Sequence, residues 1–199
     1  MPRVRDGLFE VVFVCTGNRA RSPLAEALLR RRLDPGAVCV RSLGTLSVGP
    51  VPALVEISRL AFRVGADLSH HRAQALRPCE LEETDLVVGF EPGHVSTAVV
   101  DGGADVSKTF SLIELGGLLE RHRAERLGME SHSLHPAATI QGVHALRTGG
   151  FLTAPALADP YGGSDEAFAR TFETIDRHVA TIADLVFGVA SWRSRSPDE

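Results

Sequence analysis

The stretch that decides the fold is LFEVVFV (8–14), followed directly by CTGNRARSP (15–23) and LAEALLRRRL (24–33). The first segment is β-branched and almost continuously apolar, which predicts a central strand covered on both faces. The last segment places its leucines on one helical stripe and three arginines near its end, which predicts a helix. The nine residues between them form a short loop at the carboxyl end of a strand, where open α/β sheets bind their ligands.

The rest of the chain continues this alternation of strands and helices. Further strands are predicted over 37–44, 85–90 and 108–113, and helices over 52–64, 114–127 and 164–189, with a short helix near 137–147. Such alternation implies right-handed crossovers between parallel strands. We therefore expect an α/β fold, a three-layer open sandwich with a four-stranded parallel sheet, helices on both faces and an anion-binding loop after the first strand.

The length of 199 residues favours one domain. Hydrophobic residues make up 44% and charged residues 23%, which is typical of a soluble globular protein. We expect a single domain over residues 1–190. Residues 128–157 show little strand pattern and are interpreted as an insertion within it, and residues 191–199 are expected to form a disordered tail.

Composition and charge also exclude several classes of protein. The formal net charge of −4 argues against a nucleic-acid-binding protein. No run approaches 18 apolar residues, so no membrane span is predicted, and Glu10 interrupts the apolar run near the N-terminus, unlike a secretory signal. The three cysteines have no CxxC spacing, which indicates a reducing, cytoplasmic location rather than a disulfide framework.

The loop after the first strand combines Cys15 with Arg21 six positions later. A short loop that leads into a helix N-terminus directs several backbone N–H groups into one concavity, which favours an anion. The same field stabilises a thiolate. Arg21 adds a guanidinium able to hold two oxygens of a phosphate. The sequence therefore predicts a phosphate-binding loop with a nucleophilic cysteine.

The neighbouring residues support this interpretation over a simpler one. In the simpler interpretation Cys15 is a buried strand cysteine and Arg21 a surface charge. However, Gly17 and Asn18 tolerate the positive φ angles of a tightly curled loop, and Ser22 is placed to donate a hydrogen bond to the sulfur. The combination favours a site built for chemistry.

The pattern Cys-(x)5-Arg-Ser-Pro near the N-terminus resembles the low-molecular-weight protein tyrosine phosphatase family, a superfamily that also includes arsenate reductase-like enzymes. Four later segments resemble family segments in the same order: SLGT (42–45), GADLSHHRAQAL (65–76), ETDLVVGFE (83–91) and ADPYGG (158–163). The loop together with the late Asp-Pro-Tyr is a specific combination.

The resemblance implies a metal-independent phosphomonoester phosphatase that forms a phosphocysteine intermediate, with no cofactor and with a phosphorylated protein as its substrate. Cys15 would be the nucleophile, Arg21 the phosphate clamp and Asp159 the general acid. The substrate-binding residues implied are Thr16, Gly17, Asn18, Arg19, Ala20, Ser22 and Tyr161. His71 would brace the loop, with the adjacent His70 as the alternative, and inorganic phosphate or sulfate would occupy the loop.

The sequence also departs from the family pattern. Ala20 stands where many members carry a second cysteine, Arg19 replaces a small or aliphatic residue, and LSVG (46–49) lacks an aromatic wall. Phosphotyrosine is the predicted substrate. The glycines after Tyr161 resemble members that act on protein phosphoarginine, which is one alternative; an arsenate reductase-like enzyme and a non-catalytic phosphate-binding module are the others.

Several histidines at first suggest a metal site. They are His122, His132, His135 and His144. They lack cysteine or carboxylate partners at ligand spacing, so we interpret them as loop and surface residues and predict no metal.

Overall fold

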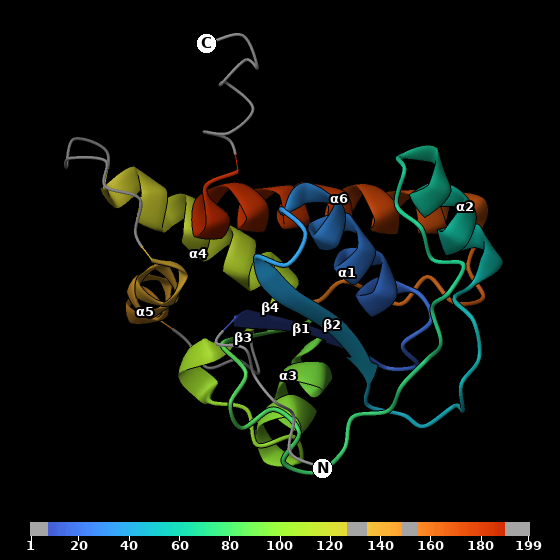
Figure 1. The fold of residues 1–199 in the computed structure, drawn as a ribbon, viewed down its shortest axis with the longest axis horizontal. Helices are drawn as coiled ribbons and strands as arrows, with labels where there is room; N and C mark the ends of the chain where they lie inside the picture. The colour runs from blue at the N-terminus through green and yellow to red at the C-terminus, as the bar shows by residue number, and fades with distance from the viewer. Residues whose placement is uncertain (1–7, 127–134, 149–154, 190–199) are drawn as a thin grey trace, which may run out of the picture.

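The computed structural model describes residues 8–126, 135–148 and 155–189. The elements in chain order are β1 (Phe9–Cys15), α1 (Arg21–Arg32), β2 (Val38–Gly44), α2 (Val55–Arg63), β3 (Leu86–Gly89), α3 (Pro92–Val100), η1 (Val106–Lys108), β4 (Thr109–Ser111), α4 (Leu112–Glu125), α5 (Pro136–Ala145) and α6 (Asp165–Phe187). Figure 1 shows the sheet between two helical layers.

The four strands form one parallel sheet, as the sequence predicts, and the structure gives their order as β2-β1-β3-β4. β1 lies inside the sheet, and its register aligns Cys15 with Gly44 of β2 and Val14 with Gly89 of β3. The carboxyl ends of these three strands therefore meet at one edge. The loop after β1 lies at that edge, where the sequence places the site.

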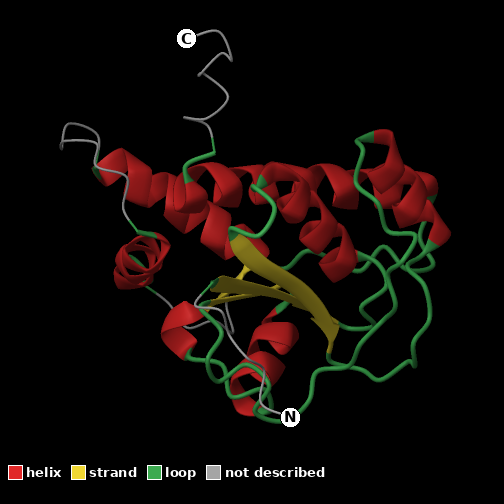
Figure 2. Cartoon of the chain, in the orientation of Figure 1, coloured by secondary structure: helices red, strands yellow, loops and turns green. Residues whose placement is uncertain are grey.

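Two apolar cores separate the three layers. Alternate residues of β1 point to opposite faces: Val11 and Phe13 pack under α1, α2, α4 and α6, while Val12 and Val14 pack toward α3. Helices cover one face of the sheet more heavily than the other, as Figure 2 shows by colour. The first strand is thus covered on both sides, which explains its continuous apolar character.

Most predicted elements are confirmed to within a few residues, with one helix missed. The sequence pattern predicts no element over PGHVSTAVV, which forms α3 (Pro92–Val100). Four of its nine residues are β-branched valine or threonine, poor helix formers. The helix begins nevertheless because Pro92 occupies its first turn and Glu91 and His94 form a capping box.

The region interpreted as an insertion is partly described. The short helix predicted near 137–147 is α5 (Pro136–Ala145). The fourth strand is shorter than predicted, since α4 begins directly after Ser111. The proposed tail 191–199 and two parts of the insertion, 128–134 and 149–154, lie outside the described residues.

Candidate active site

The loop between β1 and α1 turns its carbonyl groups outward. Five of them accept hydrogen bonds from other parts of the fold. Thr45 N donates to the Cys15 carbonyl (2.8 Å), Leu46 N to that of Thr16 (2.9 Å) and the His71 ring to that of Asn18 (2.7 Å). Leu54 N donates to the Arg19 carbonyl (2.8 Å) and Leu24 N to that of Ala20 (3.2 Å). Within the described part of the chain, the backbone N–H groups of 16–20 donate to no carbonyl or side chain. Five unpaired donors beside a helix N-terminus form a concavity suited to an anion.

Cys15 ends β1 at the base of this loop, with 2% of its surface exposed. Its Sγ lies 2.9 Å from the hydroxyl oxygen of Ser22, in the first turn of α1. That hydroxyl already accepts a hydrogen bond from Asn18 Nδ2 at 2.9 Å. The Ser22 hydroxyl has one proton, and Cys15 Sγ at 2.9 Å is nearer than its other acceptor, the Leu43 carbonyl at 3.3 Å, so this proton can stabilise a negatively charged sulfur.

Asn18 holds the loop in its curled shape. Its φ angle is +50°, in the left-handed region. Its side chain donates to Ser42 Oγ at 2.8 Å and accepts from Gln74 N at 2.9 Å. Of the two adjacent histidines, it is the His71 ring that bonds the Asn18 carbonyl, at 2.7 Å. These bonds connect the loop to β2 and to the segment after α2, which explains why both segments carry motif residues.

Gly44 allows β2 to approach the loop closely. A Cβ atom at this position would lie 2.8 Å from the carbonyl oxygen of Thr16 and 3.1 Å from the backbone nitrogen of Asn18. Both neighbours are backbone atoms, which have little freedom to move. Any side chain at position 44 would therefore displace the loop.

Arg21 is fully buried at the start of α1. Its Nη1 donates to Glu91 Oε1 and to the carbonyl of Leu157, the latter at 2.9 Å. Nη2 donates to Asp159 Oδ2 at 2.6 Å, and Nε has no hydrogen-bond partner among the described residues. With Nη1 fixed from outside, the edge formed by Nε and Nη2 is the fork left for an oxyanion.

Thr16 and His94 form a further contact at the loop. His94 Nε2 lies 2.9 Å from Thr16 Oγ1. His94 is buried at the start of α3, and its pKa is lowered to about 4, first by burial and then by the nearby Arg21 guanidinium. The ring is therefore neutral near pH 7.

The rim of the site is formed by more exposed side chains than the loop. Arg19 Nε donates to the carbonyl of Pro52 at 3.1 Å, which holds its side chain against the segment before α2. Tyr161 is 71% exposed, and Leu46 and Val48 on the facing segment are also exposed. Tyr161 and Arg19 thus lie nearer the surface than the buried Cys15 and Arg21.

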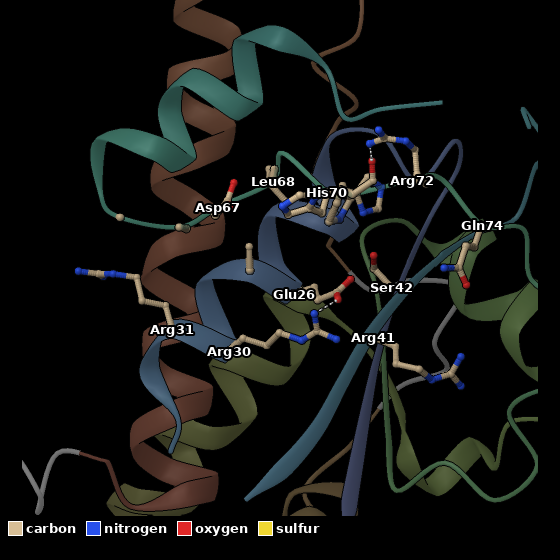
Figure 3. A pocket seen from close by; sticks show the side chains of 15 residues that line it. Glu26, Arg30, Arg31, Arg41, Ser42, Asp67, Leu68, His70, Arg72 and Gln74 are labelled. Carbon is tan, nitrogen blue, oxygen red and sulfur yellow. Dashed lines mark hydrogen bonds and ion pairs between the residues drawn. The ribbon is translucent and has the colours of Figure 1, made fainter. Parts of the chain in front are cut away.

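A cavity of about 680 Å³ lies behind the loop, between α1, the edge strand β2 and residues 65–74. Figure 3 shows Ser42 and Gln74 on one of its walls and Glu26 and Arg30 on another. Cys15, Arg21 and Asp159 do not line it. It therefore borders Ser42, His71 and Gln74, which bond Asn18, and is separate from Cys15, Arg21 and Asp159.

Two side chains at the site, those of Glu91 and His94, are not predicted as site residues by the sequence pattern. Glu91 had a detectable signal, since an acidic residue directly after a strand beside β1 falls at the same sheet edge. His94 had none, because α3 was not predicted. In the described residues no group of three or more His, Cys, Asp or Glu side chains is arranged to hold a metal ion. Nor does any described helix combine the length and apolar character needed to cross a bilayer.

Comparisons with known proteins agree with this geometry. Residues 10–127 match the family model described as low molecular weight phosphotyrosine protein phosphatase. The chain is 32% identical over 170 residues to a probable low molecular weight protein-tyrosine-phosphatase, EpsP, of Ralstonia nicotianae, covering 85% of this chain and 90% of the relative.

Two further relatives extend the comparison. A protein-arginine-phosphatase of Geobacillus stearothermophilus is 30% identical over 135 residues, covering 62% of this chain and 90% of that protein. The solved structure of the tyrosine phosphatase amsI of Erwinia amylovora superposes with a TM-score of 0.65 over 92% of this chain and 97% of its own, at 20% identity. The latter likeness shows the shared fold.

Proposed function

The chain belongs to the low molecular weight phosphotyrosine protein phosphatase family, and from this premise we propose that Cys15, Arg21 and Asp159 carry out its phosphomonoester hydrolysis. The observation that carries the proposal is the loop itself. Its carbonyls are bonded outward, and the N–H groups of 16–20, which follow Cys15 directly in the chain, have no partner among the described residues. Such a loop neutralises a dianionic phosphoryl group as its charge shifts during transfer.

The phosphoryl group is held by two sets of donors. The N–H groups of 16–20 surround it, and the Nε and Nη2 atoms of Arg21 bind two of its oxygens. Glu91 and the Leu157 carbonyl support the other end of the guanidinium. Because Arg21 is anchored before the substrate arrives, little conformational entropy is lost when the anion binds.

The chemistry follows in two steps. The Cys15 thiolate attacks phosphorus, the S–P bond forms and the P–O bond to the leaving group breaks, while protonated Asp159 gives its proton to the leaving oxygen. In the second step Asp159, now a carboxylate, takes a proton from water. That water attacks phosphorus, the S–P bond breaks, and inorganic phosphate and the thiolate are released.

Phosphotyrosine on a protein is the proposed substrate. Of the two relatives compared by sequence above, the probable tyrosine phosphatase covers 85% of this chain and the protein-arginine-phosphatase 62%. Arg19 at the rim favours acidic residues beside the phosphate and disfavours the guanidinium of phosphoarginine. The exposed Tyr161 supplies one aromatic surface for the substrate ring.

Phosphoarginine is the second candidate. It is favoured by the similarity to a protein-arginine-phosphatase and by Gly162 and Gly163 after Tyr161. The facing residues Leu46 and Val48 provide no aromatic ring that would select phosphotyrosine.

A cytoplasmic location accords with this chemistry. Cys15, Cys39 and Cys79 all carry free thiols. A thiolate nucleophile needs a reducing compartment to stay active. We accordingly place the enzyme and its phosphorylated protein substrates in the cytoplasm.

The decisive experiment is a side-by-side kinetic comparison on phosphotyrosine and phosphoarginine peptides of the same sequence, with Cys15→Ser as the blank. We expect a higher kcat/KM on phosphotyrosine and no turnover by the blank, which should still bind phosphate. Turnover by Cys15→Ser equal to that of the wild type would overturn the mechanism. A preference for phosphoarginine would establish the second candidate. No turnover of either peptide, or of p-nitrophenyl phosphate, would leave only phosphate binding.

A further inference from the structure

The hydroxyl of Thr16 lies between two donors. His94 Nε2 is 2.9 Å from Thr16 Oγ1, and Arg21 Nη2 is 3.4 Å from the same oxygen. A threonine hydroxyl has two acceptor positions and one proton. The direction of that proton therefore depends on whether both neighbours donate.

The position of the proton on His94 follows from its backbone contacts. His94 Nδ1 faces the N–H groups of Glu91, at 3.2 Å, and of Phe90, at 3.4 Å, and must accept from them. A neutral ring that accepts at Nδ1 carries its proton at Nε2. His94 thus donates to Thr16, and Arg21, which is always a donor, approaches the second acceptor position.

With both acceptor positions facing donors, Thr16 retains one function, donation of its own proton. The nitrogen of Arg21 that contacts Thr16 is also the one bonded to Asp159 at 2.6 Å, so the hydroxyl lies at the phosphate-binding edge of the guanidinium. We propose that the Thr16 hydroxyl donates a hydrogen bond to the phosphoryl oxygen held by Arg21 Nη2, and that His94 is the positioning residue that orients it. This inference rests on the proposed phosphatase function.

The consequence is a side-chain donor in addition to the backbone N–H groups. A residue without a hydroxyl at position 16 would still provide its N–H group but not this extra bond. Thr16 therefore contributes to binding of the phosphoryl group itself, independently of whether tyrosine or arginine carries it.

The first test replaces Thr16 with valine, which has the same shape and no hydroxyl. Because a hydrogen bond to a charged group contributes more than a neutral one, Thr16→Val should weaken inhibition by inorganic phosphate and benzylphosphonate by about tenfold or more, with a similar loss in kcat/KM. Thr16→Ser should restore most of the affinity. Thr181→Val is the matched control, since among the described residues the Thr181 hydroxyl bonds only to the carbonyl of Arg177 in its own helix.

The second test is a double-mutant cycle with His94→Asn. An asparagine amide can accept the Glu91 N–H group but reaches less far toward Thr16. We expect His94→Asn to raise the inhibition constant for benzylphosphonate several-fold, and to have no further effect when Thr16 is already valine. A purely structural role of His94 predicts additive losses instead, and additive losses would overturn its assignment as a positioning residue.

Urea unfolding of each variant separates loss of binding from loss of structure. If Thr16→Val does not fold, Thr16→Ala removes the same hydroxyl without adding branched bulk and is measured in its place. Unchanged inhibition constants in a folded Thr16 variant would overturn the inference while the wild type still hydrolyses p-nitrophenyl phosphate. Absence of hydrolysis by the wild type would instead refute the proposed function.

Discussion

Asp159 Oδ2 and Arg21 Nη2 are joined by a hydrogen bond of 2.6 Å. The candidate general acid thus contacts the nitrogen with which the candidate clamp would bind a phosphoryl oxygen. Nη2 carries two N–H groups, and Thr16 Oγ1 lies 3.4 Å from this nitrogen, so an anion that binds the Nε and Nη2 edge must compete with the Asp159 carboxylate for the other N–H group. Asp159 therefore affects oxyanion binding and proton transfer in opposite directions.

Asp159→Asn should lower turnover and tighten product binding at the same time. Loss of the general acid should reduce kcat by about 10²- to 10⁴-fold on substrates with poor leaving groups, and less on activated aryl phosphates. Loss of the competing negative charge should lower the inhibition constant of inorganic phosphate. An equal loss of kcat on both substrate types, with phosphate inhibition unchanged, would show that Asp159 acts only through the structure of its loop.

Arg21→Lys should abolish most of the activity although it keeps the positive charge. An ammonium group cannot bond Glu91 and the Leu157 carbonyl while presenting a planar fork to phosphate. Both kcat and the affinity for vanadate should fall. Arg32→Lys is a suitable control, since Arg32 lies at the far end of the same helix and pairs with Asp176. A near-normal kcat for Arg21→Lys would refute the bidentate role.

The predictable part of the site is the part that is contiguous in the chain. Cys15, Ser22 and Arg21 occur within eight residues, so a strand, a turn and a helix start are enough to bring them together. His71 and Asp159 came from the resemblance and not from local pattern. The structure supplies the missing reason for the first, since the His71 ring bonds the Asn18 carbonyl at 2.7 Å.

The remaining groups could not be predicted because their signals are weak or absent. Leu157 contributes a backbone carbonyl, which any residue type possesses. His94 lies in α3, which the sequence pattern does not predict because its β-branched residues are poor helix formers. The capping box and tertiary packing stabilise this helix. Thr16, the partner of His94, is 78 residues away in the chain, and hydrophobic periodicity does not predict contacts over such a separation.

Gly44→Ala should distort the loop without touching any candidate reactive group. Its Cβ would lie 2.8 Å from the Thr16 carbonyl oxygen, so we expect a loss of about 1–3 kcal/mol in stability and a marked fall in kcat/KM. Gly117→Ala is the matched control, because a Cβ there meets nothing within 4 Å in the described structure and should favour helix α4. Thermal unfolding and p-nitrophenyl phosphate kinetics measure both effects. A fully active and stable Gly44→Ala would contradict the close packing.

The free energy of unfolding should decrease as the pH is lowered, because His94 resists protonation in the folded protein. Its pKa is about 4 in the folded protein, against 6.5 for an unperturbed histidine. Between these values the unfolded chain binds the extra proton, so the folded state loses up to about 3 kcal/mol as pH drops from 6.5 to 4, and no more below that.

The measurement is urea unfolding of the wild type and His94→Asn at pH 7 and pH 4.5. Arg21, Glu91 and Asp159 surround His94, and their contributions remain in both proteins. The wild type should lose more stability than the variant on acidification. His178→Asn shows how much of the acid sensitivity comes from a second histidine whose pKa is also lowered by burial. Equal losses in wild type and His94→Asn would show that His94 does not drive the acid sensitivity.

Sustained peroxide should inactivate the enzyme irreversibly, because no thiol lies near enough to trap oxidised Cys15. In the β1–β2 register Cys39 lies opposite Glu10, five residues before Cys15 along β1. This places Cys39 about 16 Å or more from Cys15, which is too far for a disulfide. The backbone N–H group of Cys79 donates to the carbonyl of Asp101, which follows the C-terminal end of α3. A hydrogen bond with the Glu82 side chain raises the pKa of the Cys79 thiol. A sulfenic acid on Cys15 would therefore proceed to the sulfinic acid, which dithiothreitol does not reduce.

Ala20→Cys tests this explanation by adding a thiol within the loop. The variant should regain activity with dithiothreitol after a peroxide treatment from which the wild type recovers poorly, because a disulfide between residues 15 and 20 would protect the sulfur from further oxidation. Ala20→Ser, which adds a similar volume without a thiol, should behave like the wild type. Mass spectrometry of the treated proteins distinguishes the disulfide from the sulfinic acid. Full recovery of the wild type would require a resolving thiol from another molecule, and the prediction would then be wrong.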